Sequence, residues 1–109
     1  MADLRAPHLL DLEVLSVLRR RSQARRLDMA EADRLLQVFA ALTIQRHASS
    51  GHLLAIWALR HNLTTYDAAY VALSARLDCP LITLDRALAA SPQLPCQVEL
   101  LPLRPSSPP

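Results

Sequence analysis

The stretch Arg60–Asp85, RHNLTTYDAAYVALSARLDCPLITLD, decides the fold that this sequence predicts. Thr64 can accept hydrogen bonds from the first turn of a helix, and Asp67 follows three residues later, which is a capping pattern. The residues behind Asp67 are small or apolar over two turns, so the helix can pack closely against a sheet. A proline then ends the helix, and Leu81–Leu84 is an apolar run typical of a buried strand. The strand ends at Asp85, in the position where open α/β sheets hold their ligands.

The remaining patterns complete an α/β chain that is rich in helix. Hydrophobic periodicity and capping signals predict helices or helical turns at Leu9–Arg21, Asp28–Leu42, His52–Arg60 and Arg86–Ala90. Short strands are expected at Thr43–His47 and Gln97–Leu101, and Ala6–His8 is either a strand remnant or the lead-in to a helix. The sum is an α/β fold with a short parallel sheet flanked by helices.

Length and composition indicate one domain. The 109 residues, 51% of them hydrophobic, can bury a core of their own. We expect residues 1–101 to form this domain and residues 102–109, with four prolines and two serines, to form a disordered tail. No apolar run approaches the roughly 20 residues that span a bilayer, and the first residues lack the pattern of a secretory signal, so a cytoplasmic protein without membrane contact is expected. Cys79 and Cys96 lack metal-ligand spacing; they are expected to be reduced structural thiols, with a disulfide or redox pair as the alternative.

The basic residues are all arginine, and five of the twelve fall between positions 19 and 26. They are Arg19, Arg20, Arg21, Arg25 and Arg26. The planar guanidinium fork suits phosphate, so this segment is a candidate patch for RNA or for an acidic partner. The alternative is a solvated helix end whose positive charges oppose the negative end of the helix dipole. The net charge of +2 does not decide between the two.

Three acidic residues are candidates for chemistry: Glu13 at the edge of an apolar helix face, Asp67 in a first helical turn and Asp85 at a strand end. Each has an ordinary explanation, as a solvated edge residue, a helix-start charge and the N-cap of a helical turn. Carboxylates gathered at one sheet edge, however, repel one another unless protons or a divalent cation intervene. Oxygen ligands of this kind suit Mg²⁺ or Mn²⁺, and a metal held there can activate water and stabilise the leaving oxygen of a phosphodiester.

Three segments carry a family resemblance: Ala6–Arg20, APHLLDLEVLSVLRR; His61–Leu77, HNLTTYDAAYVALSARL; and Cys79–Leu88, CPLITLDRAL. They resemble the PIN-domain family, and within it the VapC-type toxin ribonucleases of bacterial toxin–antitoxin pairs. The resemblance implies a PIN-like three-layer fold. It also implies a Mg²⁺-dependent endoribonuclease whose acidic cluster binds the metal.

By motif, Glu13, Asp67 and Asp85 fall on the acidic positions that bind the metal and catalyse the reaction in this family. Thr64 and Thr83 fall on hydroxyl positions that help to order the site. The resemblance further implies RNA as the substrate, a cognate antitoxin that masks the cleft, and homodimerisation.

The resemblance begins part-way through the family pattern, which opens with a hydrophobic strand that ends in an aspartate. Twelve residues precede Glu13, whereas a strand–helix–strand unit needs roughly 30. The expected fold is therefore a PIN-like fold truncated at its N-terminus, without a central strand and the metal ligand that this strand carries. Strand edges exposed in this way would invite pairing with a partner.

Two functions of different class follow. The first is a metal-dependent endoribonuclease that uses Glu13, Asp67 and Asp85. The alternative is a catalytically impaired, truncated toxin that acts only as an antitoxin-binding or dimerising module. A small signalling domain with an acidic pocket is a third idea, and it has no support beyond Asp85.

Overall fold

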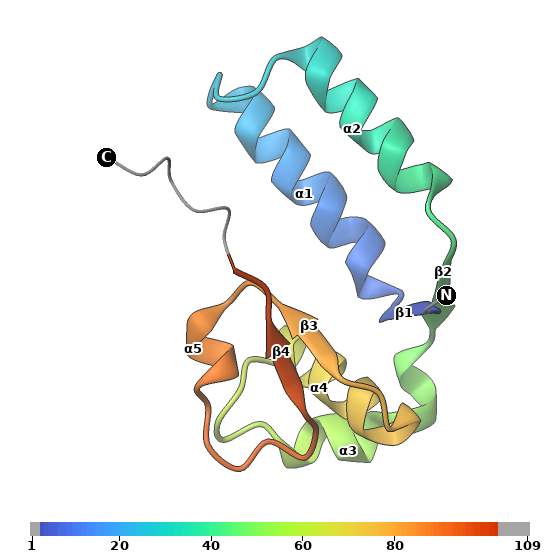
Figure 1. The fold of residues 1–109 in the computed structure, drawn as a ribbon, viewed down its shortest axis with the longest axis vertical. Helices are drawn as coiled ribbons and strands as arrows, with labels where there is room; N and C mark the ends of the chain where they lie inside the picture. Colours follow the sequence, from blue (N-terminus) through green and yellow to red (C-terminus); the bar gives the residue numbers. More distant parts are fainter. Residues whose placement is uncertain (1–2, 103–109) are drawn as a thin grey trace. The chain divides into compact units, whose positions relative to one another are not determined.

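The computed structural model describes residues 3–102 (Figure 1). Contacts divide the chain into a first unit that ends at Ala48 and a second that begins at Ser49, and each is described by itself. Within the described residues there are five α-helices, one 3-10 helix and four short strands. None of the helices between residues 3 and 102 combines the length and the apolar composition needed to cross a bilayer. Residues 103–109 of the predicted tail lie outside the described residues.

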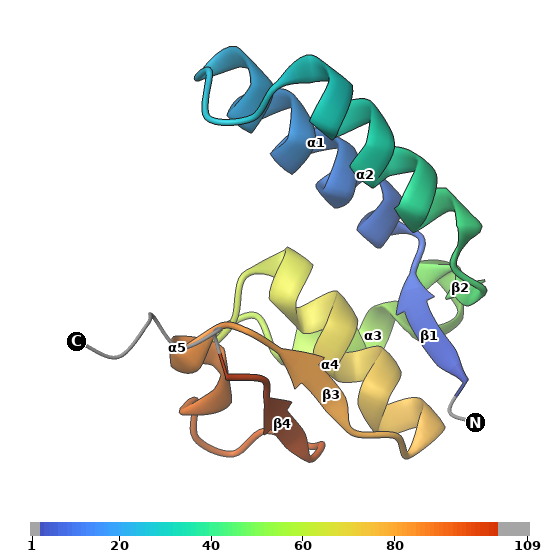
Figure 2. The ribbon, with the colours of Figure 1, turned by 45° about the horizontal axis from the view of Figure 1, so that its top comes forward.

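The first unit consists of two parallel strands and the helical hairpin that connects them (Figures 1 and 2). Strand β1 (Leu4–Pro7) pairs with β2 (Ile44–His47) residue for residue. Helices α1 (Leu9–Gln23) and α2 (Met29–Ala41) follow β1 and lie side by side in both views. The two helices and the second strand confirm the sequence prediction, and β1 resolves the two alternatives for the segment before α1 in favour of a strand.

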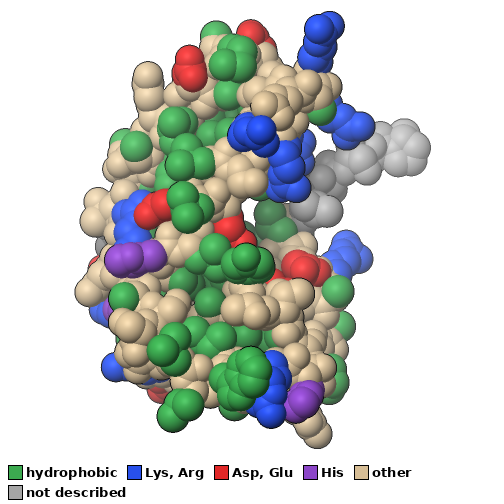
Figure 3. Space-filling view, turned by 180° about the vertical axis from the view of Figure 1, so that it is seen from behind, with side chains coloured by type: hydrophobic (Ala, Val, Ile, Leu, Met, Phe, Trp, Pro, Cys, Tyr) green, Lys and Arg blue, Asp and Glu red, His purple; other side chains and the backbone are tan. Residues whose placement is uncertain are grey.

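Helix α1 ends in a Schellman motif built on an arginine. Arg25 has a φ of 58°, in the left-handed region that favours glycine. The Arg25 amide donates to the Ser22 carbonyl at 3.1 Å, and the Arg26 amide donates to the Arg21 carbonyl at 2.9 Å. These are the two hydrogen bonds of the motif. The chain therefore folds back over the last turn of α1, and arginine side chains gather at this end of the hairpin (Figure 3).

Helix α2 has the N-cap that the sequence predicts, but its capping box is incomplete. Asp28 is extended, and its carboxylate accepts a hydrogen bond from the Ala30 amide at 3.4 Å. Glu31 stands three residues after Asp28, where a capping box would have its acid bond back to the cap, but its carboxylate accepts two bonds from the Arg34 guanidinium at 2.9 and 2.6 Å. Two charged hydrogen bonds are stronger than one bond to a neutral amide, which explains the difference.

An ion pair joins α1 to β2 inside the first unit. Arg46 Nη2 lies 2.7 Å from Asp11 Oδ1, and Arg46 Nε donates to the same carboxylate at 3.2 Å. Arg46 Nη1 donates to the Ile44 carbonyl at 2.9 Å, and Arg46 Cζ lies 5.8 Å from the centroid of the Phe39 ring. The hydrogen bond from Arg46 holds the pKa of Asp11 below its ordinary value of 3.8. The Arg46 guanidinium thus contacts residues of α1, α2 and β2.

The second unit packs a central helix against two parallel strands. Its elements in chain order are the 3-10 helix η1 (Ser49–His52), α3 (Leu53–Ala58), α4 (Thr65–Leu77), β3 (Leu81–Thr83), α5 (Arg86–Ala89) and β4 (Val98–Leu100). Beyond the β3–β4 pairs, the Leu81 amide donates to the Gln97 carbonyl and the Leu101 amide donates to the Thr83 carbonyl, each at 2.8 Å. The helix expected from His52 to Arg60 is present in part, since α3 spans Leu53–Ala58 and His52 is the last residue of the preceding 3-10 helix.

The core of the second unit lies around α4. Val71 is fully buried and forms one apolar cluster with Leu81 of β3 and Leu88 of α5. Half-buried side chains pack around this cluster: Leu59, Leu63, Tyr70, Leu94, Cys96 and Val98. The small residues of α4 are buried as well: Ala68, Ala69, Ala72 and Ser74. Because these side chains are short, other elements can approach the helix closely, as the sequence predicts.

The α/β class with short parallel strands and flanking helices is confirmed. Within the described residues the strands form two separate ladders, β1 with β2 and β3 with β4, where the sequence suggested one sheet. A hydrophobic pattern identifies the residues that form a strand but carries little information on which strands pair.

Replacing Arg25 by glycine is expected to stabilise the protein by about 0.5–1 kcal/mol, because glycine adopts the left-handed conformation without a steric penalty. Gln23→Gly is the matched control. Gln23 is the last residue of α1, and a glycine in a helix costs up to about 1 kcal/mol. Urea unfolding measures both variants, and changes of the same sign would contradict the Schellman motif at Arg25.

Asp11→Asn tests the ion pair with Arg46 through its pH dependence. The pKa of Asp11 is lowered in the folded state, so the pair stabilises the fold above the unfolded-state pKa of about 3.9 and this contribution is lost as the pH falls through the folded-state value. The difference in unfolding free energy between wild type and variant should be largest above about pH 5 and shrink in stronger acid. Urea unfolding across this range measures it. A difference that does not change with pH would show that the pair contributes nothing.

Candidate active site

Helix α4 and strand β3 run in opposite directions, so the start of the helix and the end of the strand lie at the same end of the second unit (Figure 2). From Asp67 to Leu77 the helix rises about 15 Å, at 1.5 Å per residue. Strand β3 (Leu81–Thr83) runs back along the helix at roughly 3.3 Å per residue, and a bend at Leu84 leads to Asp85. Because β3 runs opposite to α4, Asp85 lies towards the helix end that carries Asp67.

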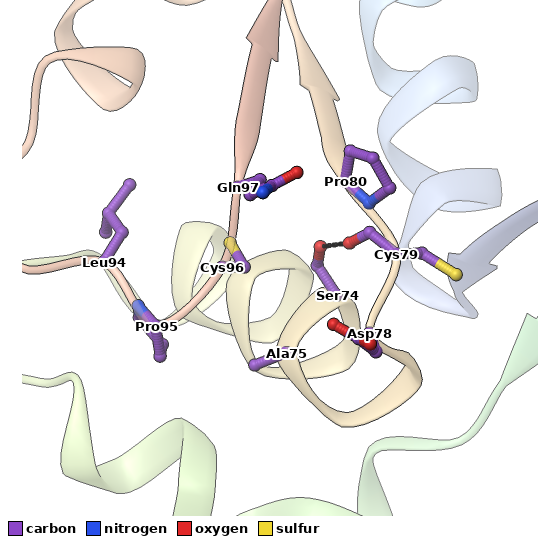
Figure 4. A pocket seen from close by; sticks show the side chains of 9 residues that line it. All are labelled: Ser74, Ala75, Asp78, Cys79, Pro80, Leu94, Pro95, Cys96 and Gln97. Carbon is purple, nitrogen blue, oxygen red and sulfur yellow. Dashed lines mark hydrogen bonds between the residues drawn. The ribbon is translucent and has the colours of Figure 1, made fainter.

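Two hydrogen bonds between Ser74 and Cys79 hold the turn between α4 and β3, and Figure 4 shows the one from the Ser74 side chain. The Ser74 hydroxyl donates to the Cys79 carbonyl, and the Cys79 amide donates to the Ser74 carbonyl at 3.1 Å. Asp78 has a φ of 52°, which reverses the chain. Sequence reasoning missed Ser74 as a positioning residue. Its signal is a hydroxyl within an otherwise apolar and alanine-rich helix, shortly before a proline.

A cavity of about 580 Å³ lies beside this turn, at the opposite end of α4 from the two aspartates (Figure 4). Cys79 and Cys96 line it, with Asp78 as the only acidic residue among its lining residues in the described chain. Both cysteines are free thiols, and their sulfurs point away from each other. The cavity therefore lacks the paired carboxylates of the predicted chemistry.

Thr64 caps α4 and holds the backbone of Asp67. The Thr64 hydroxyl accepts a hydrogen bond from the Asp67 amide at 3.1 Å, and the Thr64 carbonyl accepts one from the Ala68 amide at 2.9 Å. Asp67 is half-buried in the first turn of the helix, where the helix dipole stabilises a negative charge. The predicted cap is confirmed, and it fixes the backbone from which the Asp67 carboxylate extends.

Asp85 follows β3 and caps α5. Its Oδ1 accepts hydrogen bonds from the Ala87 amide at 2.9 Å and the Leu88 amide at 3.2 Å. The Asp85 amide donates to the Thr83 hydroxyl at 3.0 Å. The ordinary explanation of Asp85 as an N-cap is confirmed. It leaves room for chemistry, because among the described residues these bonds use Oδ1 alone and Oδ2 remains available on the exposed side chain.

The groups at this end of the second unit fit a divalent cation. Asp67 and Asp85 bring two carboxylates there, and the ion pairs found within the described residues involve neither of them. Mg²⁺ and Mn²⁺ take oxygen ligands of this kind, and Mg²⁺ is commonly bound through one or two carboxylates and several waters. Across residues 3–102, no group of three or more histidine, cysteine, aspartate or glutamate side chains is assembled to hold a metal ion.

Glu13, the third predicted ligand, belongs to the first unit. It lies on α1 and is half-buried. Asp67 and Asp85 lie in the second unit, so their convergence with Glu13 stays a prediction. The metal-binding and catalytic roles of the three carboxylates stay predictions with it, as do the supporting roles of Thr64 and Thr83.

The comparison with known proteins decides the family. A PIN domain matches residues 2–92. This chain belongs to the PIN-domain family. A VapC ribonuclease of Mycobacterium bovis is 41% identical to it over 99 residues, which are 91% of this chain and 78% of that protein. Ribonuclease VapC1 of Mycobacterium tuberculosis is 45% identical over 97 residues, which are 88% of this chain and 73% of that protein.

The chain is therefore a VapC-type PIN-domain protein, as the resemblance of its motifs predicted. A shorter match is ribonuclease VapC3 of Pyrobaculum aerophilum, which is 42% identical over 57 residues, or 52% of this chain and 44% of that protein. All five predicted site residues of this VapC-type chain lie inside the matched PIN domain: Glu13, Thr64, Asp67, Thr83 and Asp85.

Asp85→Ala and Asp85→Asn separate the capping role from the chemical one. Alanine removes the cap of α5 and should destabilise the protein by about 1 kcal/mol, whereas asparagine is as good a cap and should change stability by only a few tenths of a kcal/mol. Urea unfolding measures the difference. Equal losses in the two variants would show that the carboxylate charge, not the cap, supports α5. Asp85→Asn is then the variant in which activity can be tested in an intact fold.

Proposed function

We propose that this VapC-type protein is a metal-dependent endoribonuclease of the toxin–antitoxin type. The observation that supports the proposal is the return of β3 along α4, which brings Asp67 and Asp85 to one end of the second unit. Two relatives that match most of this chain are named ribonucleases. In such a protein, two carboxylates at the carboxyl end of a strand are best explained as part of a site for phosphodiester hydrolysis.

Glu13, Asp67 and Asp85 are the residues proposed to hold Mg²⁺, with Mn²⁺ as a substitute. When bound, the ion would lower the pKa of a water and stabilise the charge that develops on the phosphate oxygens. The protein chain itself holds the proposed metal ligands in position. Asp67 and Asp85 extend from backbone segments that are held by the hydroxyls of Thr64 and Thr83, so both carboxylates start from a fixed backbone before RNA binds.

The proposal includes three partners. RNA is the substrate, a cognate antitoxin protein masks the site, and a second copy of the chain completes a homodimer. The cytoplasm is the proposed location, because RNA and the antitoxin are available there.

The alternative is a catalytically impaired module that only binds an antitoxin or dimerises. One observation favours it. Each sheet of the described residues has two strands, so β3 is paired with β4 alone and presents a second edge without a strand, and Ile82 on β3 is 52% exposed. An apolar strand edge of this kind is a surface to which another chain can add.

RNA cleavage in defined metal separates the two functions. We expect the purified full chain to cleave a single-stranded RNA in Mg²⁺ or Mn²⁺ and to stop in excess chelator. Glu13→Gln, Asp67→Asn and Asp85→Asn should each lower the rate by more than about 100-fold, since even groups that only support a metal ligand cost 10- to 100-fold when removed. Titration of the protein with Mn²⁺ by calorimetry should show saturable binding that Asp67→Asn with Asp85→Asn removes.

Asp78→Asn is the matched control for these variants. Asp78 lies at the other end of α4 and has a left-handed conformation that asparagine tolerates, so the same charge is removed from the same unit without harm to the proposed site. It should cleave RNA like wild type. A wild-type chain that binds Mn²⁺ at no site and cuts no RNA, yet copurifies with a small partner protein, would establish the binding module instead.

A further inference from the structure

The arginine cluster of the first unit is a charged surface that the proposed catalytic residues do not use. It comprises Arg19, Arg20, Arg21, Arg25 and Arg26, all exposed. Three of them line a hollow of about 370 Å³ at the end of α1, together with Val17 and Ala24. Figure 3 shows arginine side chains spread over this end of the α1–α2 hairpin. The cluster therefore combines a concave shape with a high density of positive charge.

The Schellman motif builds the hollow. The hydrogen bond from the Arg26 amide to the Arg21 carbonyl folds the chain back onto the helix end. Arg26, five residues after Arg21, is thereby placed beside the last turn of α1 and lines the hollow together with Arg20 and Arg21. Arginines from the helix and from the segment after it thus line one hollow.

The charge of the cluster is not compensated within the described residues. The ion pairs found there are Arg34 with Glu31 and Arg46 with Asp11, so none of the five arginines has a carboxylate partner. Arg20 Nε donates only to the Ser16 carbonyl, at 3.4 Å. The negative end of the α1 dipole amounts to about half a charge, against five positive charges. An anion that bound here would relieve repulsion among the guanidiniums.

Arg25 belongs to the same charged surface. Its left-handed backbone is disfavoured for residues with a side chain, because the Cβ atom crowds the following carbonyl oxygen. Glycine is the usual residue at this position of the motif. The motif therefore holds Arg25 within the charged surface, at a position where glycine is usual.

We propose that the arginine cluster binds the phosphodiester backbone of single-stranded RNA. Guanidinium forks match phosphate oxygens in geometry and charge. Val17 and Ala24 add an apolar surface to the hollow, against which a ribose or the face of a base can lie. A nucleotide offers the phosphate and the apolar face together, whereas an acidic side chain offers charge alone. The inference rests on the proposed ribonuclease function and gives the protein a site that binds its RNA substrate.

Binding without cleavage tests this site. A labelled single-stranded oligoribonucleotide is titrated with the full chain in chelator, and its anisotropy is followed at several salt concentrations. Removing three phosphate contacts with Arg20→Gln, Arg21→Gln and Arg26→Gln together should weaken binding by at least about tenfold. The slope of log affinity against log salt should fall in magnitude by about 2, at roughly 0.7 per contact.

A charge-matched control distinguishes this surface from positive charge in general. Arg5→Gln, Arg34→Gln and Arg60→Gln together remove three exposed arginines from elsewhere and should leave the salt slope within about half a contact of wild type. Equal losses in the two triple variants would overturn the proposal. So would tight binding of polyglutamate by the wild-type chain that the cluster variant abolishes while RNA binding is unaffected, because the cluster would then recognise an acidic protein.

Arg25→Gly is a control for the possibility that the triple variant does not fold. It is expected to be more stable than wild type, yet it should bind RNA more weakly and lose about 0.7 of the salt slope. Unchanged RNA binding in this variant, together with unchanged binding in the triple variant, would overturn the site. Because these measurements use no metal and no cleavage, failure of the nuclease proposal would appear separately, as intact RNA binding by a chain that cuts nothing in Mg²⁺ or Mn²⁺.

Discussion

The burial of helix α4 is the constraint on which the second unit depends. Val71 has no exposed surface, and its neighbours on the helix are mostly alanine. Short side chains allow α3, β3 and α5 to approach the helix, while the apolar contacts with Leu81 and Leu88 supply the hydrophobic stabilisation. The turn held by Ser74 then sends the chain straight back along the helix. Any larger side chain on this face would push β3 away and move the strand end that carries Asp85.

Two residues of the candidate site also have structural roles. Thr64 is the N-cap of α4. Asp85 is the N-cap of α5, and one of its carboxylate oxygens accepts hydrogen bonds from two backbone amides. A cap holds its side chain in one orientation, which is also what a metal ligand needs. The ordinary and the functional explanations of these residues are therefore not alternatives. The same hydrogen bonds that begin a helix can set the direction in which the second carboxylate oxygen points.

The first unit combines firm internal links with local strain. Arg46 ties Asp11 on α1 to β2 through charged hydrogen bonds and lies over Phe39 of α2, which connects the hairpin to its strands. At the far end of the same hairpin, Arg25 occupies a conformation that glycine would adopt more easily. Uncompensated arginines surround this point. The ion pair of Arg46 thus links the strand end of the hairpin, and the charged end carries the left-handed Arg25.

The sequence by itself determined the local elements and the family. Periodicity, caps and prolines are properties of neighbouring residues, so α4, its Thr64 cap and the strand that leads to Asp85 could be read directly, and the motifs around them placed the chain in the PIN-domain family. Only the tertiary structure decided which strands pair, that Glu31 would bind Arg34 rather than its cap, and that Ser74 would lock the turn. It alone brought Arg26 back beside Arg21. These outcomes depend on competition between partners that meet only after the chain has folded, and a pattern along the sequence cannot rank partners that it does not bring together.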